Sequence, residues 1–428
     1  MKEKTFTRYE VFVITILTIL QFTIILDFMV LSPLGAILMP ALKITPAQFG
    51  MVVSAYAFSA GGAGLLAAGF ADKFDRKKLL LFFYVGFVIG TFLCGIAPDY
   101  NFLLMARVVT GLFGGVIGSI SFAIITDLFR MEVRGRVMGF IQMSFASSQV
   151  LGIPLGLYLA NKWGWHSPFL LIVGVSVAVG VLIVVYLKPI NAHLKVQSDR
   201  NAFQHLGKTL SRFTYLKAFA ATTLLATGGF MLMPFGSAFS VNNLGLKLSQ
   251  LPMLYMITGI FSMATGPIIG KLSDSVGKYT IFFWGTMLTI AVVIFYVNLG
   301  VTPLSTVIIV SILMFTGVSS RIISSSALMT AVPEPADRGA FMGINASVQQ
   351  ISGGIATFIA GHIVVERIDK SLANYDVLGY TVVGTMLISA LMMYFIHRYV
   401  DRKTKAAAKN NAAPPVTSAA IAEGASAH

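Results

Sequence analysis

Long apolar runs separated by short polar joints follow one another along almost the whole chain. A bilayer core about 30 Å thick is crossed by roughly 20 apolar residues in a helix. Twelve segments meet this requirement, and we predict a transmembrane helix at each: 11–39, 47–71, 79–97, 102–127, 137–160, 168–187, 214–241, 249–272, 280–299, 302–331, 340–364 and 378–397. The first segment is too long for a signal peptide and has no small-residue cleavage site, so we expect it to remain as a helix.

Composition agrees with a membrane protein, because 56% of the 428 residues are hydrophobic, 11% are charged and the mean hydropathy is +0.81. A net charge of +14 would suggest nucleic acid as the partner of a soluble protein. Here 24 of the 31 Lys and Arg residues fall on one side of the predicted segments, 5 on the other and 2 within them. The positive-inside rule therefore predicts that both termini are cytoplasmic. We expect a multi-pass protein of the cell membrane that contacts lipid and has no nucleic-acid partner. Cys94 stands alone and excludes an internal disulfide.

The longest polar interruption divides six predicted helices from six. We expect an N-terminal bundle over 1–187, a cytoplasmic linker over 188–213, a C-terminal bundle over 214–402 and a disordered tail over 403–428. The tail is rich in Ala, Asn, Pro and Ser, a composition that cannot bury a core.

The two halves of the chain resemble each other. The joint GFADKFDRKK after the second segment matches GKLSDSVGKY after the eighth, which places Asp72 and Asp274 at an offset of 202. At an offset of 204, the run from Arg134 to Gly139 matches the run from Arg338 to Gly343. Such parallel repeats predict a substrate site between the halves, near the middle of the membrane.

The joints resemble the loop signature of the major facilitator superfamily, Gly-x-Leu-Ala-Asp-Arg-x-Gly-Arg-Lys. The second copy matches at Gly270, Leu272, Asp274, Gly277 and Lys278, and the first keeps Asp72, Arg76 and Lys77. The resemblance implies an all-α fold of twelve transmembrane helices in two six-helix halves, and a secondary transporter that works by alternating access. It also implies that the charged joint residues form a conformational latch; the alternative is that they only anchor the loops in lipid headgroups.

Three further features resemble the drug:proton antiporter branch of that superfamily: Arg107 with Gly111, the pair Leu26-Asp27, and Gly152, Pro154 and Gly156 in the fifth segment, where Ile153 and Leu157 replace glycines of the pattern. The resemblance implies proton-coupled export. The simpler interpretation of the fifth segment is a kink with close helix packing.

Only three ionisable residues lie deep in the predicted segments: Asp27, Arg107 and Arg321. Charges at this depth are costly and usually face a partner or a pathway. Asp27 and Arg107 can meet in the outer half of the membrane, either as a proton-coupling pair or as a static structural pair. Arg321 then has no carboxylate, and it either binds an anionic group of a substrate or holds backbone carbonyls.

Other candidate substrate residues are amides and large apolar side chains. Amides often tie helices together, whereas Met and Phe form adaptable walls that suit a lipophilic solute. The candidates are Asn345, Gln349, Gln142, Met233 and Phe235.

The chain carries no phosphate-binding loop, zinc-ligand spacing or Gly-x-Ser-x-Gly elbow, so we expect neither an enzyme nor a cofactor or metal. We predict a monomeric proton-coupled antiporter that exports amphipathic small molecules. One alternative is a symporter or exchanger of an organic anion or lipid-like solute. Another is a membrane receptor or scaffold without transport activity.

Overall fold

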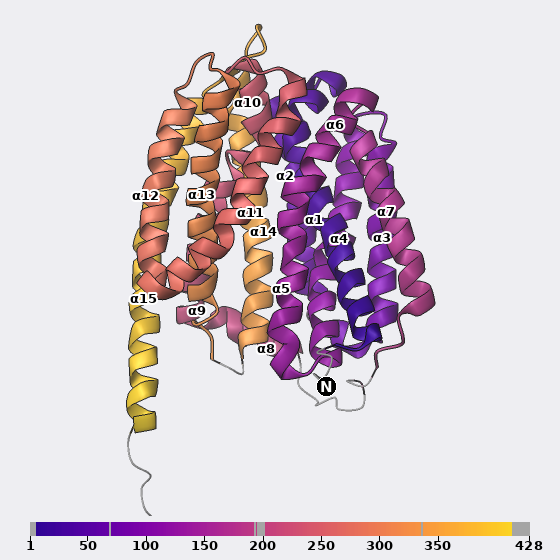
Figure 1. The fold of residues 1–428 in the computed structure, drawn as a ribbon, viewed down its shortest axis with the longest axis vertical. Coiled ribbons are helices and arrows are strands. Elements are labelled where there is room, and N and C mark those ends of the chain that lie inside the picture. Colours follow the sequence, from indigo (N-terminus) through magenta and orange to yellow (C-terminus); the bar gives the residue numbers. More distant parts are fainter. Residues whose placement is uncertain (1–5, 68–69, 192–193, 195–201, 335–336, 413–428) are drawn as a thin grey trace, which may run out of the picture.

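A computed structural model describes residues 6–67, 70–191, 194, 202–334 and 337–412. Its helices pack side by side in one bundle (Figure 1). In chain order they are α1 (Arg8–Leu42), α2 (Pro46–Ala67), α3 (Arg76–Gly95), α4 (Tyr100–Leu128), α5 (Met131–Ser147), α6 (Ile153–Trp163), α7 (Ser167–Tyr186), α8 (Ala202–Ser211), α9 (Phe213–Phe230), α10 (Gly236–Asn242), α11 (Leu251–Val276), α12 (Lys278–Val297), α13 (Leu304–Met329), α14 (Arg338–Ile363) and α15 (Tyr375–Ala412). A short antiparallel pair, β1 (Val365–Glu366) and β2 (Leu372–Ala373), joins α14 to α15.

Within the described residues each of the twelve predicted segments is mostly helical, and eleven helical segments are long and apolar enough to cross a membrane. The segment outside that set is α14, whose glycines and amides lower its hydropathy; it packs against α2 and α9 within the bundle. Two segments are interrupted. A π-helical turn at Ser148–Gly152 separates α5 from α6, and a 3-10 turn at Met233–Phe235 separates α9 from α10. Pro154 and Pro234 lie at these breaks, where they remove a backbone donor.

The bundle has two distinct ends. The β1–β2 hairpin marks one, called here the hairpin end, and the first described residues, α8 and the end of α15 mark the other, called the termini end (Figure 1). The region predicted as linker contains α8, and α15 continues ten residues past the predicted start of the tail, with an Asp401–Lys405 ion pair of 2.8 Å one turn apart. Residues 413–428 lie outside the described part.

The first half of the chain (α1–α7) meets the second half (α9–α15) mainly toward the hairpin end. Four hydrogen bonds between described residues join the halves, and all lie in that part of the bundle: Ser237 Oγ with Ala36 N and Ser32 O, Ser54 Oγ to Gly354 O, and Asn161 Nδ2 to Leu248 O. Close backbone approach supports them, because a Cβ on Gly50 would lie 3.0 Å from the carbonyl oxygen of Thr357.

Toward the termini end the helices α5, α11 and α14 leave open space beside their glycines. A Cβ placed on any of six glycines there would meet no atom within 4 Å: Gly135, Gly139, Gly266, Gly270, Gly339 and Gly343. In α5 the buried positions are Val137, Ile141 and Ser144, spaced as one helix face, and the Ser144 hydroxyl bonds the Thr18 carbonyl of α1. The bundle is therefore held together at the hairpin end and looser at the other.

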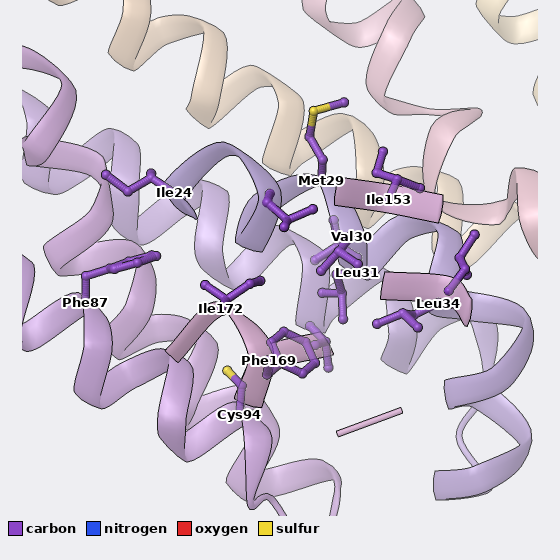
Figure 2. Close-up of a cluster of buried hydrophobic side chains, with 14 of the residues drawn as sticks. Ile24, Met29, Val30, Leu31, Leu34, Phe87, Cys94, Ile153, Phe169 and Ile172 are labelled. Atoms are coloured by element: carbon purple, nitrogen blue, oxygen red, sulfur yellow. The ribbon is translucent and has the colours of Figure 1, made fainter. Parts of the chain in front are cut away.

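The hydrophobic core of the first half surrounds α1. Figure 2 shows Val30, Leu31 and Leu34 of this helix beside Phe169 and Ile172 of α7, all buried. Cys94 lies in the same cluster as a free, buried thiol (Figure 2). This packing places Asp27, one turn before Leu31, inside the first half.

Candidate functional site

An ion pair lies in the middle of the first half. Asp27 of α1 and Arg107 of α4 are joined by a 2.8 Å contact between Oδ2 and Nη1, and their side chains are 0% and 1% exposed. The sequence suggested that these residues meet, and the structure brings them together. A buried pair of this kind holds both charges only while each neutralises the other.

Two further side chains complete the surroundings of the pair. Thr91 of α3 donates a hydrogen bond of 3.2 Å to Asp27 Oδ1, and the ring centroid of Tyr56 of α2 lies 4.5 Å from Arg107 Cζ. Arg107 Nε has no hydrogen-bond partner. Arg107 thus has a second favourable contact, the aromatic face, that does not depend on the charge of Asp27.

Glycines let α2, α3 and α4 approach closely enough to form this arrangement. A Cβ on Gly111 would collide with the Ser59 hydroxyl and the Tyr56 carbonyl, and one on Gly90 would lie 2.7 Å from the amide nitrogen of Thr110. Gly111 belongs to the predicted Arg-Gly motif, and its role in the structure is to seat the backbone of α4 against α2.

Aromatic contacts lead from the pair to the other half of the molecule. The ring of Phe28, next to Asp27 in sequence, lies 5.3 Å from Tyr56 and 5.9 Å from Phe230 of α9, measured between ring centroids. A Cβ on Gly353 of α14 would lie 2.9 Å from the Phe230 ring. The ion pair therefore contacts the interface between halves through two aromatic side chains.

The π-helical turn brings the fifth predicted segment against α1 beside the pair. A Cβ on Gly152 would lie 2.6 Å from Leu26, and one on Gly156 would lie 2.9 Å from Val30. On the other side of the turn, Gly259 of α11 faces the Gln149 backbone. Gly152, Pro154 and Gly156 thus lie at a break in the helix, with the two glycines packed closely against α1, which is the geometry of the simpler interpretation.

Arg321 lies in the second half, away from the other two charged residues. Its side chain is buried, with Nη2 3.3 Å from the Ser389 hydroxyl of α15 and Cζ 5.9 Å from the Phe282 ring centroid of α12. Arg321 therefore points among the helices of the second half.

A family model described as Major Facilitator Superfamily matches residues 17–357. The chain belongs to the major facilitator superfamily. It is a transporter of this superfamily and not an enzyme.

Curated relatives of this transporter are distant. The Bacillus subtilis "Uncharacterized MFS-type transporter YceJ" is 26% identical over 63% of this chain and 68% of its own length. "Multidrug resistance protein 3" of the same organism is 33% identical over 36% of this chain, but the match spans only 30% of that relative's length.

Two solved structures share the fold over nearly their whole length. A bacterial homologue of the human lysosomal transporter Spinster, in an inward-facing and occupied conformation, has a TM-score of 0.68 at 14% identity, covering 94% of this chain and 98% of its own. The nucleoside transporter NupG has a TM-score of 0.69 at 13% identity, covering 90% and 99%.

The other candidate substrate residues of the transporter are scattered. Asn345 accepts a hydrogen bond of 2.6 Å from Thr222, which ties α14 to α9. Gln142 and Gln349 are exposed on α5 and α14. Phe235 is fully buried against Phe49 near the hairpin end, with ring centroids 6.0 Å apart, and Met233 is half-buried.

The predicted latch residues do not form one cluster in the described part. Arg76 is joined to Asp127 of α4 by a 3.0 Å contact, and Lys77 Nζ donates to the Val184 carbonyl at 2.9 Å. Asp274 is exposed and Lys278 is half-buried. The side chain of Asp72 lies outside the described residues.

Sequence reasoning missed several residues of these sites. Tyr56 and Thr91 are uncharged, and nothing in their segments separates them from packing residues. In the second half, Arg212 contacts Asp337 at 2.8 Å and Glu334 at 3.2 Å. These contacts raise the pKa of the Arg212 guanidinium, and the hydrogen bond to Glu334 is the largest cause. Arg212 and Asp337 each directly precede the start of a helix, and this placement is the only signal of the group in the sequence.

Proposed function

We propose that this transporter is a proton-coupled antiporter that exports amphipathic small molecules by alternating access. In this proposal it is a monomer in the cell membrane, with both termini in the cytoplasm and the hairpin end outside. The excess of Lys and Arg in the joints of the termini end supports this orientation.

The observation that carries the proposal is the fully buried Asp27–Arg107 ion pair. A proton that binds Asp27 removes the negative charge and releases Arg107 from its strongest contact. The guanidinium then keeps the Tyr56 ring as its partner. Loss of the proton restores the pair, so the Asp27 carboxylate is neutralised alternately by a proton and by Arg107, as proton coupling requires.

The aromatic contacts supply a physical route from this change to the interface between halves. Movement of Arg107 acts on Tyr56, which packs on Phe28, and Phe28 contacts Phe230 of the second half. We expect Phe28→Ala to reduce proton-driven transport while leaving the Asp27–Arg107 pair intact. Wild-type transport by this variant would rule out the route.

The substrate class rests on the character of the open region and on relatives. The glycines of α5, α11 and α14 that face open space lie toward the termini end, together with the exposed amides of Gln142 and Gln349. This surface combines apolar helices with a few polar groups, which suits an amphipathic solute better than a sugar. Two relatives carry multidrug resistance in their names, which favours export.

The proposal is tested with purified protein in liposomes under an imposed pH gradient, using a panel of lipophilic cations and organic anions. We expect transport of cationic or neutral amphipathic compounds by the wild type. Asp27→Asn should abolish gradient-driven transport but retain substrate binding, because it removes titration and keeps the side-chain volume. Asp376→Asn, at an exposed carboxylate in the first turn of α15, is the matched control and should transport normally.

The test also separates the alternatives. Gradient-driven accumulation of organic anions alone would favour the symporter or exchanger. Absence of transport for every compound, with ligand binding retained, would favour the receptor or scaffold. The placement of Arg321 inside the second half gives the organic-anion alternative less support than the sequence alone did.

A further inference from the structure

A small cavity opens between α1, α6 and α7, beside the π-helical turn. Its volume is about 110 Å³, and its walls include Leu26 of α1, Leu155 of α6 and Ile172 of α7. Leu26 and Ile172 are buried, whereas Leu155 is 47% exposed. Leu151 of the π-helical turn also lines the cavity and is 65% exposed. The cavity therefore reaches from the outer surface of the bundle inward to α1.

The walls of this cavity present hydrocarbon to an occupant. The lining residues are apolar except for Thr23, and the Thr23 hydroxyl already donates to the Leu20 carbonyl of its own helix at 2.7 Å. An apolar cavity of about 150 Å³ lined by Leu, Ile and Phe side chains stays dry and binds small apolar molecules. A polar group placed here would lose its hydrogen bonds to water without replacement. The occupant that fits this lining is therefore a hydrocarbon group.

The position of the cavity determines which hydrocarbon can reach it. Thr23 and Leu26 lie near the middle of α1 (Arg8–Leu42), far from both of its ends. At the middle of a bilayer the surroundings are lipid acyl chains, because the headgroups lie at its two surfaces. Exposed apolar residues continue from the mouth along α7, at Leu170, Val177 and Val181. The surface around the mouth is thus continuous with the apolar surface that a membrane-spanning bundle turns toward lipid.

We propose that this cavity binds the terminal part of an acyl chain of a bilayer lipid. The chain end enters between α6 and α7 and contacts Leu26, the neighbour of Asp27 in sequence. Its methylene groups supply the dispersion contacts that the walls of an empty cavity lack. An amphipathic transported compound is a poorer occupant, because the lining offers its polar group no partner. The site is separate from the Asp27–Arg107 pair and does not depend on proton coupling.

The test uses the full-length protein in liposomes that contain a phosphatidylcholine with a photoreactive diazirine near the terminal methyl group of one acyl chain. After illumination, mass spectrometry locates the residues that carry lipid adducts. We expect adducts on Thr23 and Leu26, which are 1% and 3% exposed and which a lipid on the outer surface does not touch. Adducts on Val181, an exposed residue of α7 outside the lining, serve as the reference.

Val175→Phe should reduce the Thr23 and Leu26 adducts roughly tenfold relative to those on Val181, because Val175 lines the cavity and the larger ring fills it. Val177→Phe is the matched control, since Val177 is 51% exposed on the same helix and lies outside the lining. We expect this variant to give the wild-type adducts.

Wild-type adducts confined to exposed side chains would overturn the proposal, and this result decides the question even if Val175→Phe does not fold. Equal adducts on Thr23 and Leu26 in the wild type and in a folded Val175→Phe would also overturn it. So would loss of these adducts on addition of the lipophilic cation tetraphenylphosphonium, with the Val181 adducts unchanged, which would assign the cavity to transported compounds. The test uses no pH gradient and measures no transport, so failure here leaves the proposed antiport untouched.

Discussion

Replacement of Asp27 by Asn tests the central ion pair through stability as well as transport. The variant leaves Arg107 buried and charged without its counter-ion, and breaking a buried pair in this way costs about 3–5 kcal/mol. The Asn carbonyl can still accept a hydrogen bond from the guanidinium, which recovers about 1.5–3 kcal/mol. Because the Tyr56 contact is present in both proteins, it does not change the balance. We therefore expect a net loss of about 2 kcal/mol.

The assay is a double-mutant cycle, with thermal midpoints in detergent for wild type, Asp27→Asn, Arg107→Gln and the double variant. Each single variant leaves one buried partner uncompensated, whereas the double variant removes both charges. We expect the double variant to be more stable than the sum of the two losses predicts, while remaining inactive under a pH gradient. Additive losses, or gradient-driven transport by the double variant, would refute the role of the pair.

Three further predictions concern packing, an unsatisfied group and the termini end. Gly111→Ala should destabilise the protein, because its methyl group would collide with α2. Gly118→Ala should be tolerated, because its Cβ would lie 3.7 Å from the nearest side chain. The thermal midpoints of the two variants in detergent test this difference. The Tyr84 hydroxyl is buried without a hydrogen-bond partner, so Tyr84→Phe should leave the thermal midpoint unchanged or raise it. The expected gain in unfolding free energy is up to about 1–3 kcal/mol. A lower midpoint would show that the hydroxyl has a partner. Asp127→Asn should slow turnover more than it weakens substrate binding, because it breaks the contact with Arg76; equal rates in liposomes would favour the headgroup-anchor interpretation.

Much of the fold could be predicted because the bilayer imposes a simple rule. Apolar runs of sufficient length become helices, and in the described residues most predicted segments coincide with one helix, while 137–160 and 214–241 are each interrupted by a short turn. The breaks were harder to predict. Pro154 marks the end of the π-helical turn, but proline alone does not say whether a helix kinks, ends or gains a residue per turn. The extension of α15 past 402 was missed because an Ala- and Lys-rich sequence favours a helix as readily as it favours disorder.

The candidate site could be predicted only where charge made it visible. Asp27 and Arg107 are conspicuous because few charges are placed in apolar helices, and their depths allow them to meet. Tyr56 and Thr91 complete the site but look like ordinary helix residues in the sequence. The orientation of Arg321 was likewise beyond reach, since a helix position gives depth and not the face on which its neighbours lie.

The internal repeat explains why the two halves cannot share the same chemistry. At offsets of 202 to 204, Asp27 corresponds to the run from Gly229 to Met231, and Arg107 to the run from Ile309 to Ser311. The second half thus has no charged counterpart of either residue. In the proposed coupling, a proton on Asp27 acts within the first half, and its effect must cross the interface to close one side and open the other. The residue that corresponds to Asp27 at an offset of 203 is Phe230, which is the side chain that Phe28 contacts across that interface. The position of the titratable Asp27 in the first half is thus occupied in the second half by an apolar side chain, Phe230. This side chain contacts Phe28, the neighbour of Asp27 in sequence, across the interface.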